Sequence, residues 1–164
     1  MVNVIKVLAI DQASINTAYS VWQDSELIKY NTLVADKKIK SHARIRQMSM
    51  KISEMIVNES PDYVIFEDCQ LQAGNAATFQ VLCQLQGMIM SKLYDMKLSF
   101  DIVRPSVWKS YLGVAKGKRD VQKANTIKKI EEIYKLDLQE NDDIADAIGI
   151  GHYAINKLLA EVQI

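Results

Sequence analysis

The sequence predicts an α/β fold, a mixed five-stranded sheet with helices packed on both faces. Three observations predict it. Apolar runs of strand length dominate the start of the chain, helical spacing of apolar residues follows, and the two patterns then alternate. This order of elements is typical of one sheet covered by helices. A length of 164 residues fits a single domain, residues 1–164, with a substantial core.

The N-terminal part of the chain is expected to form three antiparallel strands. A nearly continuous apolar run over 4–10 is typical of a strand buried on both faces, and it stops at Asp11. Runs at 17–22 and 27–34 are rich in β-branched and aromatic residues, and residues 23–26 between them have the composition of a turn.

Helical and extended patterns alternate in the rest of the chain. Apolar residues at helical spacing predict an amphipathic helix over about 41–59, with Ser41 as its N-cap. Short buried strands are expected at 63–66 and 100–103, and further helices at 75–97, 107–112, 121–134 and 142–161.

The composition is that of a soluble globular protein, with 49% hydrophobic and 24% charged residues. The apolar N-terminal run is too short to span a membrane and lacks a signal-peptide cleavage site, so no membrane association is expected. Cys69 and Cys83 form no CxxC pattern, which favours a reducing setting and a cytoplasmic location.

The formal net charge is zero, but the charges are segregated along the chain. Residues 101–135 contain nine Lys or Arg and four Asp or Glu, a net charge of +5, so the remainder carries −5. This distribution predicts a basic surface next to an acidic site. A solvated helix face would also explain the charge.

Four acidic residues are candidates for one site. Asp11 follows the first expected strand, Glu67 follows the fourth, and Asp143 and Asp146 are three residues apart on one face of the last helix. Ligands of open α/β sheets collect at the carboxyl ends of strands. If the last helix begins at that edge, the four carboxylates converge.

Convergent carboxylates predict a bound cation. At about 4 Å and an effective dielectric constant of about 20, each pair of like charges costs about 4 kcal/mol. An oxygen-only ligand set suits Mg²⁺ or Mn²⁺, and His42 and His152 lie outside the pattern. Two such ions would hold the attacking water and the leaving oxygen of a phosphodiester.

Each acid also has a purely structural interpretation. Asp11 could cap a turn, Glu67 could pair with a lysine, and Asp143 could be a helix N-cap. Asp146 is harder to explain in this way, because an acid between apolar neighbours in a helix is costly unless it is compensated.

The chain resembles the RuvC family of Holliday-junction resolvases, within the RNase H-like superfamily, over nearly its whole length. The segments that carry the resemblance are AIDQAS (9–14), PDYVIFED (61–68), GNAATFQVLCQLQGMI (74–89) and DIADAIGIGH (143–152). It implies an RNase H-like fold and favours Asp143 over Asp142 as a ligand. The metal ligands that it implies are Asp11, Glu67, Asp143 and Asp146.

Two further segments resemble those in which the family carries functional lysines. RPSVWK (104–109) places one at Lys109, and GKRDVQ (117–122) places the other at Lys118. Both are expected near the scissile phosphate, where they would neutralise charge that develops on phosphorus. The residues expected to bind DNA are Arg104, Lys109, Lys116, Lys118, Arg119 and Lys123.

The resemblance implies a metal-dependent endonuclease that nicks opposing strands of four-way or related branched DNA. Two Mg²⁺ ions per active site are expected, with Mn²⁺ as a substitute. Symmetrical cutting requires two active sites related by a twofold axis, so a homodimer is expected, with the apolar helix 75–97 as its interface.

The chain departs from the family's pattern at two places. Ala9-Ile10-Asp11-Gln12-Ala13 stands where cellular members read GIDPG, and no aromatic residue follows Glu67 in the segment Asp68-Cys69-Gln70. These departures indicate a divergent, phage-type member in a bacterial host cytoplasm, with a broader choice of branched DNA.

Three alternative functions remain at this point. The fold could serve a non-catalytic junction-binding protein or a ribonuclease that acts on RNA–DNA hybrids, and residues 9–21 faintly resemble the first phosphate loop of actin-like ATPases. Trp108 and Tyr111 could stack on bases, or they could anchor the short helix in the core.

Overall fold

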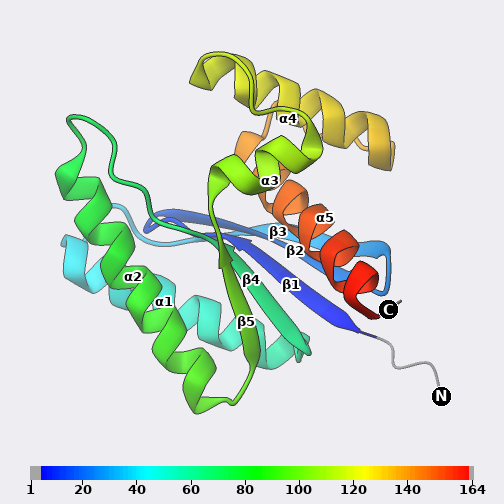
Figure 1. Ribbon diagram of the computed structural model, residues 1–164. Coiled ribbons are helices and arrows are strands. Elements are labelled where there is room, and N and C mark those ends of the chain that lie inside the picture. The colour runs from blue at the N-terminus through cyan, green and yellow to red at the C-terminus, as the bar shows by residue number, and fades with distance from the viewer. Residues whose placement is uncertain (1–4, 163–164) are drawn as a thin grey trace.

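The computed structural model describes residues 5–162, and it confirms the predicted fold class (Figure 1). The five strands form one mixed sheet in the order β3-β2-β1-β4-β5. The first three strands pair antiparallel, as expected, whereas β4 and β5 run parallel to β1. Position 4 of the first predicted strand lies outside the described residues.

Each element predicted from the sequence is present, and its ends lie within two residues of the predicted ends. The strands are β1 (Lys6–Asp11), β2 (Asn16–Gln23), β3 (Glu26–Val34), β4 (Tyr63–Glu67) and β5 (Ser99–Val103). The helices are α1 (Ser41–Glu59), α2 (Ala76–Asp95), α3 (Pro105–Leu112), α4 (Arg119–Tyr134) and α5 (Asp142–Val162).

One predicted helix cap is wrong. Helix α1 begins at Ser41, but the residue in the N-cap position is Lys40, and it makes no side-chain cap hydrogen bond. Ser41 is therefore the first helical residue and not the cap.

Among the described residues, none of the helices combines the length and the apolar character that crossing a membrane requires.

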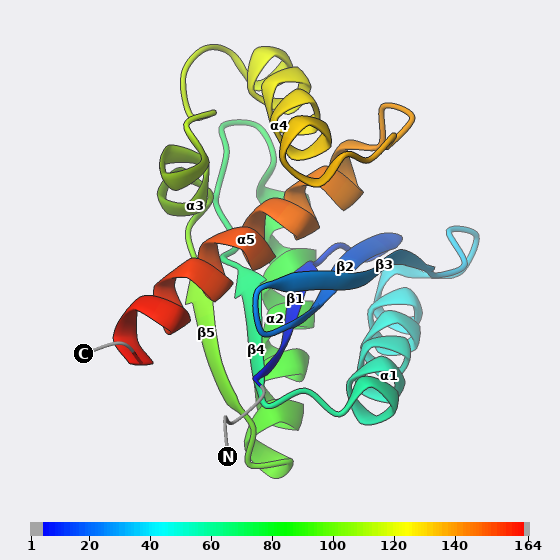
Figure 2. The same ribbon diagram turned by 90° about the vertical axis from the view of Figure 1, so that its right-hand side faces the viewer.

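Helices cover both faces of the sheet (Figures 1 and 2). Helices α1 and α2 pack together on one face, above a core formed by the side chains of Leu8 and Ile10 from β1. Helix α5 crosses the other face, where Val7 and Ala9 of β1 are buried, and α3 and α4 lie outside it. Successive residues of β1 thus serve opposite cores, as the alternation of a strand requires.

The same alternation sets the direction of the acids at the strand ends. Asp11 has the parity of Ala9 on β1, and Glu67 has the parity of Ile65 on β4. The two strands are parallel neighbours, with Ile10 opposite Phe66. Both carboxylates therefore emerge side by side at one edge of the sheet, on the face that α5 covers.

Small residues on α5 let this helix approach the sheet closely. Ala145 and Ala147 are fully buried, and Ser20 Oγ donates a hydrogen bond to the carbonyl of Ala147 at 2.7 Å. A β-carbon built on Gly149 would lie 2.6 Å from the ring of Trp108. This close packing fixes the N-terminal turns of α5 at the edge where β1 and β4 end.

Candidate active site

A cleft of about 760 Å³ opens at the carboxyl ends of β1 and β4. Its walls come from both strand ends, the loop that follows β4, the start of α2, helix α3 and the first turns of α4 and α5. The charged residues that line it are Asp11, Glu67, Asp68, Lys109, Arg119, Lys123, Asp142, Asp143 and Asp146. The structure therefore brings together the four acids singled out in the sequence.

The N-terminus of α5 is capped by Asn141, which leaves Asp143 free for another role. Asn141 Oδ1 accepts a hydrogen bond from the backbone N–H of Ile144 at 3.0 Å. The alternative that Asp143 is the N-cap is therefore wrong. Asp142 forms an ion pair with Lys123 of α4. Asp142 thus holds α4 against α5, and Asp143 lines the cleft without a salt bridge to a described residue.

Asp11 lies in the strongest concentration of negative charge. Burial raises the pKa of Asp11 well above its usual range, and the carboxylates of Glu67 and Asp146 raise it further. Lys109 opposes the shift without cancelling it. Asp11 is therefore costly to ionise in this cleft unless more positive charge is supplied, and its interpretation as a simple turn cap does not account for this environment.

Asp146 is mostly buried and incompletely satisfied. Its Oδ2 is 3.9 Å from Lys109 Nζ, and its Oδ1 is buried with no hydrogen-bond partner. Burial raises the pKa of Asp146 to about 7, although Lys109 opposes the shift. A buried acceptor without a donor is unfavourable. A bound cation or a proton would stabilise this oxygen.

The carboxylate of Glu67 is held by the indole of Trp108. Trp108 Nε1 donates a hydrogen bond to Glu67 Oε1 at 2.8 Å. Burial raises the pKa of Glu67, and this hydrogen bond opposes the rise. No lysine or arginine of the described residues lies within salt-bridge distance of Glu67, so the alternative that it pairs with a lysine is wrong.

Two glutamines that the sequence reasoning missed join the strand ends to α2. Gln12 is buried, and its Nε2 donates to the carbonyl of Glu67 at 3.2 Å and to Gln86 Oε1 at 3.0 Å. Gln86 Oε1 also accepts the backbone N–H of Cys69 at 3.1 Å. Gln12 stands where the family carries proline, so the departure noted in the sequence was the available signal.

The basic residues expected to bind DNA divide into two groups. Lys109, Arg119 and Lys123 line the cleft. Lys109 is only 15% exposed, and its Nζ lies 5.2 Å from the centre of the Trp108 ring. The residues that do not line the cleft are Arg104, Lys116 and Lys118, and all three are exposed.

Lys118, which the family pattern implied near the scissile phosphate, does not line the cleft. It occupies the N-cap position of α4, and the next residue, Arg119, lines the cleft instead. Arg119 Nη1 donates to Gln72 Oε1 at 3.4 Å, which joins α4 to the loop after β4. Arg119 is therefore the better placed of the two to contact a phosphate in the cleft.

The two aromatic residues of α3 differ in exposure. Trp108 is 0% exposed, so the possibility that it stacks on bases is wrong and its role in the core is confirmed. Tyr111 is 52% exposed and packs edge-on against Tyr153. Leu71, in the loop after Glu67, is also 65% exposed, and the sequence alone did not predict this exposure.

The residues of the cleft fit a hard divalent cation. The candidate donors are all carboxylate oxygens, and one of them, Asp146 Oδ1, is buried without a partner. As the side chains stand, no group of three His, Cys, Asp or Glu within residues 5–162 has metal-binding proximity. Like-charged carboxylates repel one another, and this cleft brings four of them within interaction distance, Asp11, Glu67, Asp143 and Asp146.

Comparisons with known proteins identify the family of this chain. A family model described as "Crossover junction endodeoxyribonuclease RuvC" matches residues 7–153. The search of curated proteins found no match.

Solved structures share the fold at low sequence identity. The Thermus thermophilus RuvC in complex with a Holliday junction substrate is 14% identical, with a TM-score of 0.74 over 94% of this chain and 96% of that one. The Fowlpox virus resolvase in complex with Holliday junction DNA is 18% identical, with a TM-score of 0.63 over 94% and 99%. The yeast mitochondrial Holliday junction resolvase is 13% identical, with a TM-score of 0.67 over 91% and 78%.

Proposed function

Because this chain belongs to the RuvC family of crossover junction endodeoxyribonucleases, we propose that it nicks opposing strands of Holliday junctions and related branched DNA. The observation that carries the proposal is the convergence of Asp11, Glu67, Asp143 and Asp146 in one cleft that basic residues flank. The products are 5′-phosphate and 3′-hydroxyl ends that a ligase can seal.

The cleft residues would hold up to two Mg²⁺ ions, for which Mn²⁺ can substitute. The ligands are Asp11, Glu67, Asp143 and Asp146. Bound there, the ions supply an activated water and neutralise charge on the reacting phosphate. Asp142 is excluded from this set because Lys123 already engages it.

The basic side chains of the cleft bind and orient the DNA backbone. Lys109, held between Asp146 and the ring of Trp108, places its charge beside the reacting phosphate. Arg119 and Lys123 of α4 also line the cleft and bind neighbouring phosphates. The exposed Arg104, Lys116 and Lys118 extend this basic surface away from the cleft.

The active form is a homodimer assembled through α2. Only Leu85, Ile89 and Leu93 of this 20-residue helix are buried, whereas Met88 and Tyr94 are 40% and 66% exposed. A four-way junction presents two equivalent cleavage positions, which a twofold dimer matches.

The dimer is tested by charge placed on the outer face of α2. Apart from its chain neighbours and the backbone of its own helix, no heavy atom of residues 5–162 lies within 4 Å of a β-carbon built on Gly87, so Gly87→Arg fits the isolated fold. Sedimentation should show a dimer for the wild type and a monomer for this variant. Val57→Arg, at an exposed position of α1, is the control and should remain dimeric. A dimeric Gly87→Arg protein would rule out this interface.

The proposed activity is tested on a panel of synthetic substrates: a four-way junction, a three-way junction, a flap, a linear duplex and an RNA–DNA hybrid. With Mg²⁺, paired nicks in opposing strands of the four-way junction are expected, and EDTA should abolish them. Junction binding without nicking would identify a non-catalytic binding protein. Preferential cutting of the hybrid would identify a ribonuclease.

A further inference from the structure

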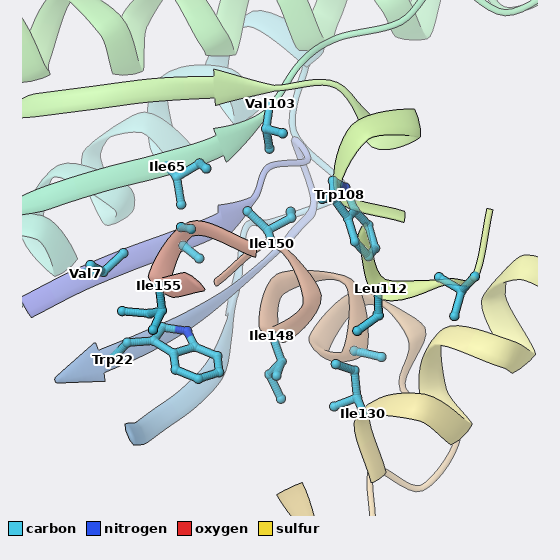
Figure 3. Close-up of a cluster of buried hydrophobic side chains, with 14 of the residues drawn as sticks. Val7, Trp22, Ile65, Val103, Trp108, Leu112, Ile130, Ile148, Ile150 and Ile155 are labelled. Carbon is cyan, nitrogen blue, oxygen red and sulfur yellow. The ribbon is translucent and has the colours of Figure 1, made fainter. Parts of the chain in front are cut away.

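The indole of Trp108 connects the hydrophobic core to the cleft. Its side chain is completely buried and packs in the same cluster as Val103, Leu112 and Ile150 (Figure 3). Its ring nitrogen nevertheless donates a 2.8 Å hydrogen bond to Oε1 of Glu67. The rigid ring is thus held by the core at one side and by an acid of the cleft at the other.

We propose that Trp108 is a positioning residue that holds the Glu67 carboxylate in the orientation in which it binds the divalent cation. The inference rests on the proposed function, because Glu67 acquires this role only if the cleft binds metal. Mutation of a donor that holds a metal ligand in place typically costs about 10- to 100-fold in metal affinity.

Glu67 needs such a partner because its side chain is long and lies at the end of a strand. Ordering a glutamate side chain costs rotamer entropy. Among the described residues, Trp108 Nε1 is the group found to donate to the Glu67 carboxylate. With Oε1 engaged, Oε2 has no donor from residues 5–162 and is left for a cation.

Helix α3 and helix α5 together fix the position of this indole. Gly149 of α5 faces the ring so closely that a β-carbon there would lie 2.6 Å from its Cζ3. The next residue along α3, Lys109, reaches Asp146 of the same α5 helix at 3.9 Å. One turn of α3 thus places Trp108 on one candidate ligand and Lys109 beside another.

Trp22, the other tryptophan of the chain, provides an internal control. It is 1% exposed and belongs to the same buried cluster. Its Nε1 donates to Ser20 Oγ at 2.8 Å and contacts no acid of the cleft. Gly151 of α5 faces its ring more closely still, since a β-carbon there would lie 1.9 Å from Nε1. A merely structural effect should perturb both indoles, whereas a ligand-positioning effect should perturb one.

The first test follows the two indole N–H signals in a ¹H–¹⁵N NMR spectrum, assigned with Trp22→Phe and Trp108→Phe. Addition of Mg²⁺ should shift the Trp108 signal and leave the Trp22 signal in place. In the metal-free protein, Glu67→Gln should also shift only the Trp108 signal, because a neutral acceptor replaces a charged one. A Trp108 signal that neither change moves would overturn the proposal.

The second test measures Mn²⁺ affinity by calorimetry. Trp108→Phe keeps an aromatic ring but removes the donor, and it should weaken binding about 10-fold or more. Gly149→Ala should weaken binding as well, because it displaces the ring. Trp22→Phe, which removes an indole donor that contacts no acid of the cleft, is the control and should bind as the wild type does. If a variant does not fold, the NMR titration of the wild type still decides.

Metal binding by the wild type and by Trp108→Phe separates a failure of the proposed function from a failure of the proposed role of Trp108. If the wild type takes up neither Mn²⁺ nor Mg²⁺, the proposed metal-dependent function fails, and this inference fails with it. If the wild type binds metal and Trp108→Phe binds it equally well, Trp108 has no positioning role, and the proposed function is unaffected.

Discussion

The two faces of the sheet are packed by different kinds of side chain. On the α1/α2 face, branched and sulphur-containing residues such as Ile52, Met48 and Leu85 pack against a mainly apolar strand surface. On the α5 face, Ala145, Ala147 and Gly149 bring the helix so close that polar atoms of helix and sheet meet. The first face is suited to stability, and the second holds the acids in place.

The largest effect is expected when acids on the α5 face are neutralised. Asp11→Asn or Asp146→Asn should lower cleavage of a four-way junction about 1,000-fold, about 4 kcal/mol in activation free energy, because each removes a candidate metal ligand. Gel-shift assays should show junction binding retained. Asp142→Asn is the matched control and should keep most activity, since Lys123 engages Asp142. Full cleavage by Asp146→Asn would contradict the assignment.

The opposite effect is expected from the α1/α2 face. Ile52→Ala opens a cavity at a side chain that is 1% exposed and should lower the free energy of unfolding by about 3 kcal/mol. Cleavage per folded molecule should stay within about twofold of the wild type, because Ile52 has no link to the cleft. Urea unfolding and cleavage at low temperature measure the two quantities. Lost catalysis in fully folded protein would show that the faces are not separable.

Two lysines on the α5 side of the sheet are expected to affect catalysis and DNA binding differently. Lys109→Ala should lower kcat about 10- to 100-fold with little change in KM, since its charge lies inside the cleft beside Asp146. Lys118→Ala should mainly weaken junction binding, because this exposed residue does not line the cleft. Steady-state kinetics on one junction separate the two effects. Equal losses of kcat in both variants would indicate that Lys118 also acts beside the reacting phosphate.

The smallest effect concerns the cost of the acids in the absence of metal. Burial and neighbouring carboxylates raise the pKa of Asp11, so its ionised form destabilises the metal-free fold once the pH exceeds its unfolded pKa of about 4. At pH 8 in EDTA, Asp11→Asn should gain about 1 kcal/mol, or about 2–4 °C in Tm. Thermal unfolding should show the gain vanish below about pH 4. A loss of Tm at pH 8 would contradict the account.

The fold was predictable from the sequence because its elements are locally encoded. The apolar run before Asp11 and the helical spacing of α1 required no tertiary information, and their ends agree with the structure within about two residues. The N-cap of α1 was missed because a serine beside a helix start is a preference, and Lys40 takes the position without a side-chain bond.

The candidate site was predictable only in part. Asp11 and Glu67 mark strand ends, and Asp143 and Asp146 share a helix face, so their grouping followed from general rules of α/β sheets. The Trp108 hydrogen bond to Glu67 was not predictable from the residues, because it joins positions 41 residues apart through the close approach of three elements.

The placement of the lysines shows a second limit. A basic loop can direct neighbouring side chains to different sides, so the sequence could not decide between Lys118 and Arg119. The role of Gln12 was hidden for a similar reason: its partners Glu67 and Gln86 lie on β4 and α2, far along the chain.

The central claim is that four acids distant in sequence form one cation site, and a Mn²⁺-soaked crystal tests it most directly. The anomalous difference map should show a peak bonded to oxygens of Asp11 and Asp146, with Glu67 or Asp143 completing the protein ligands. A crystal without a peak in this cleft at saturating Mn²⁺, or with its Mn²⁺ bound at other residues alone, would contradict the account.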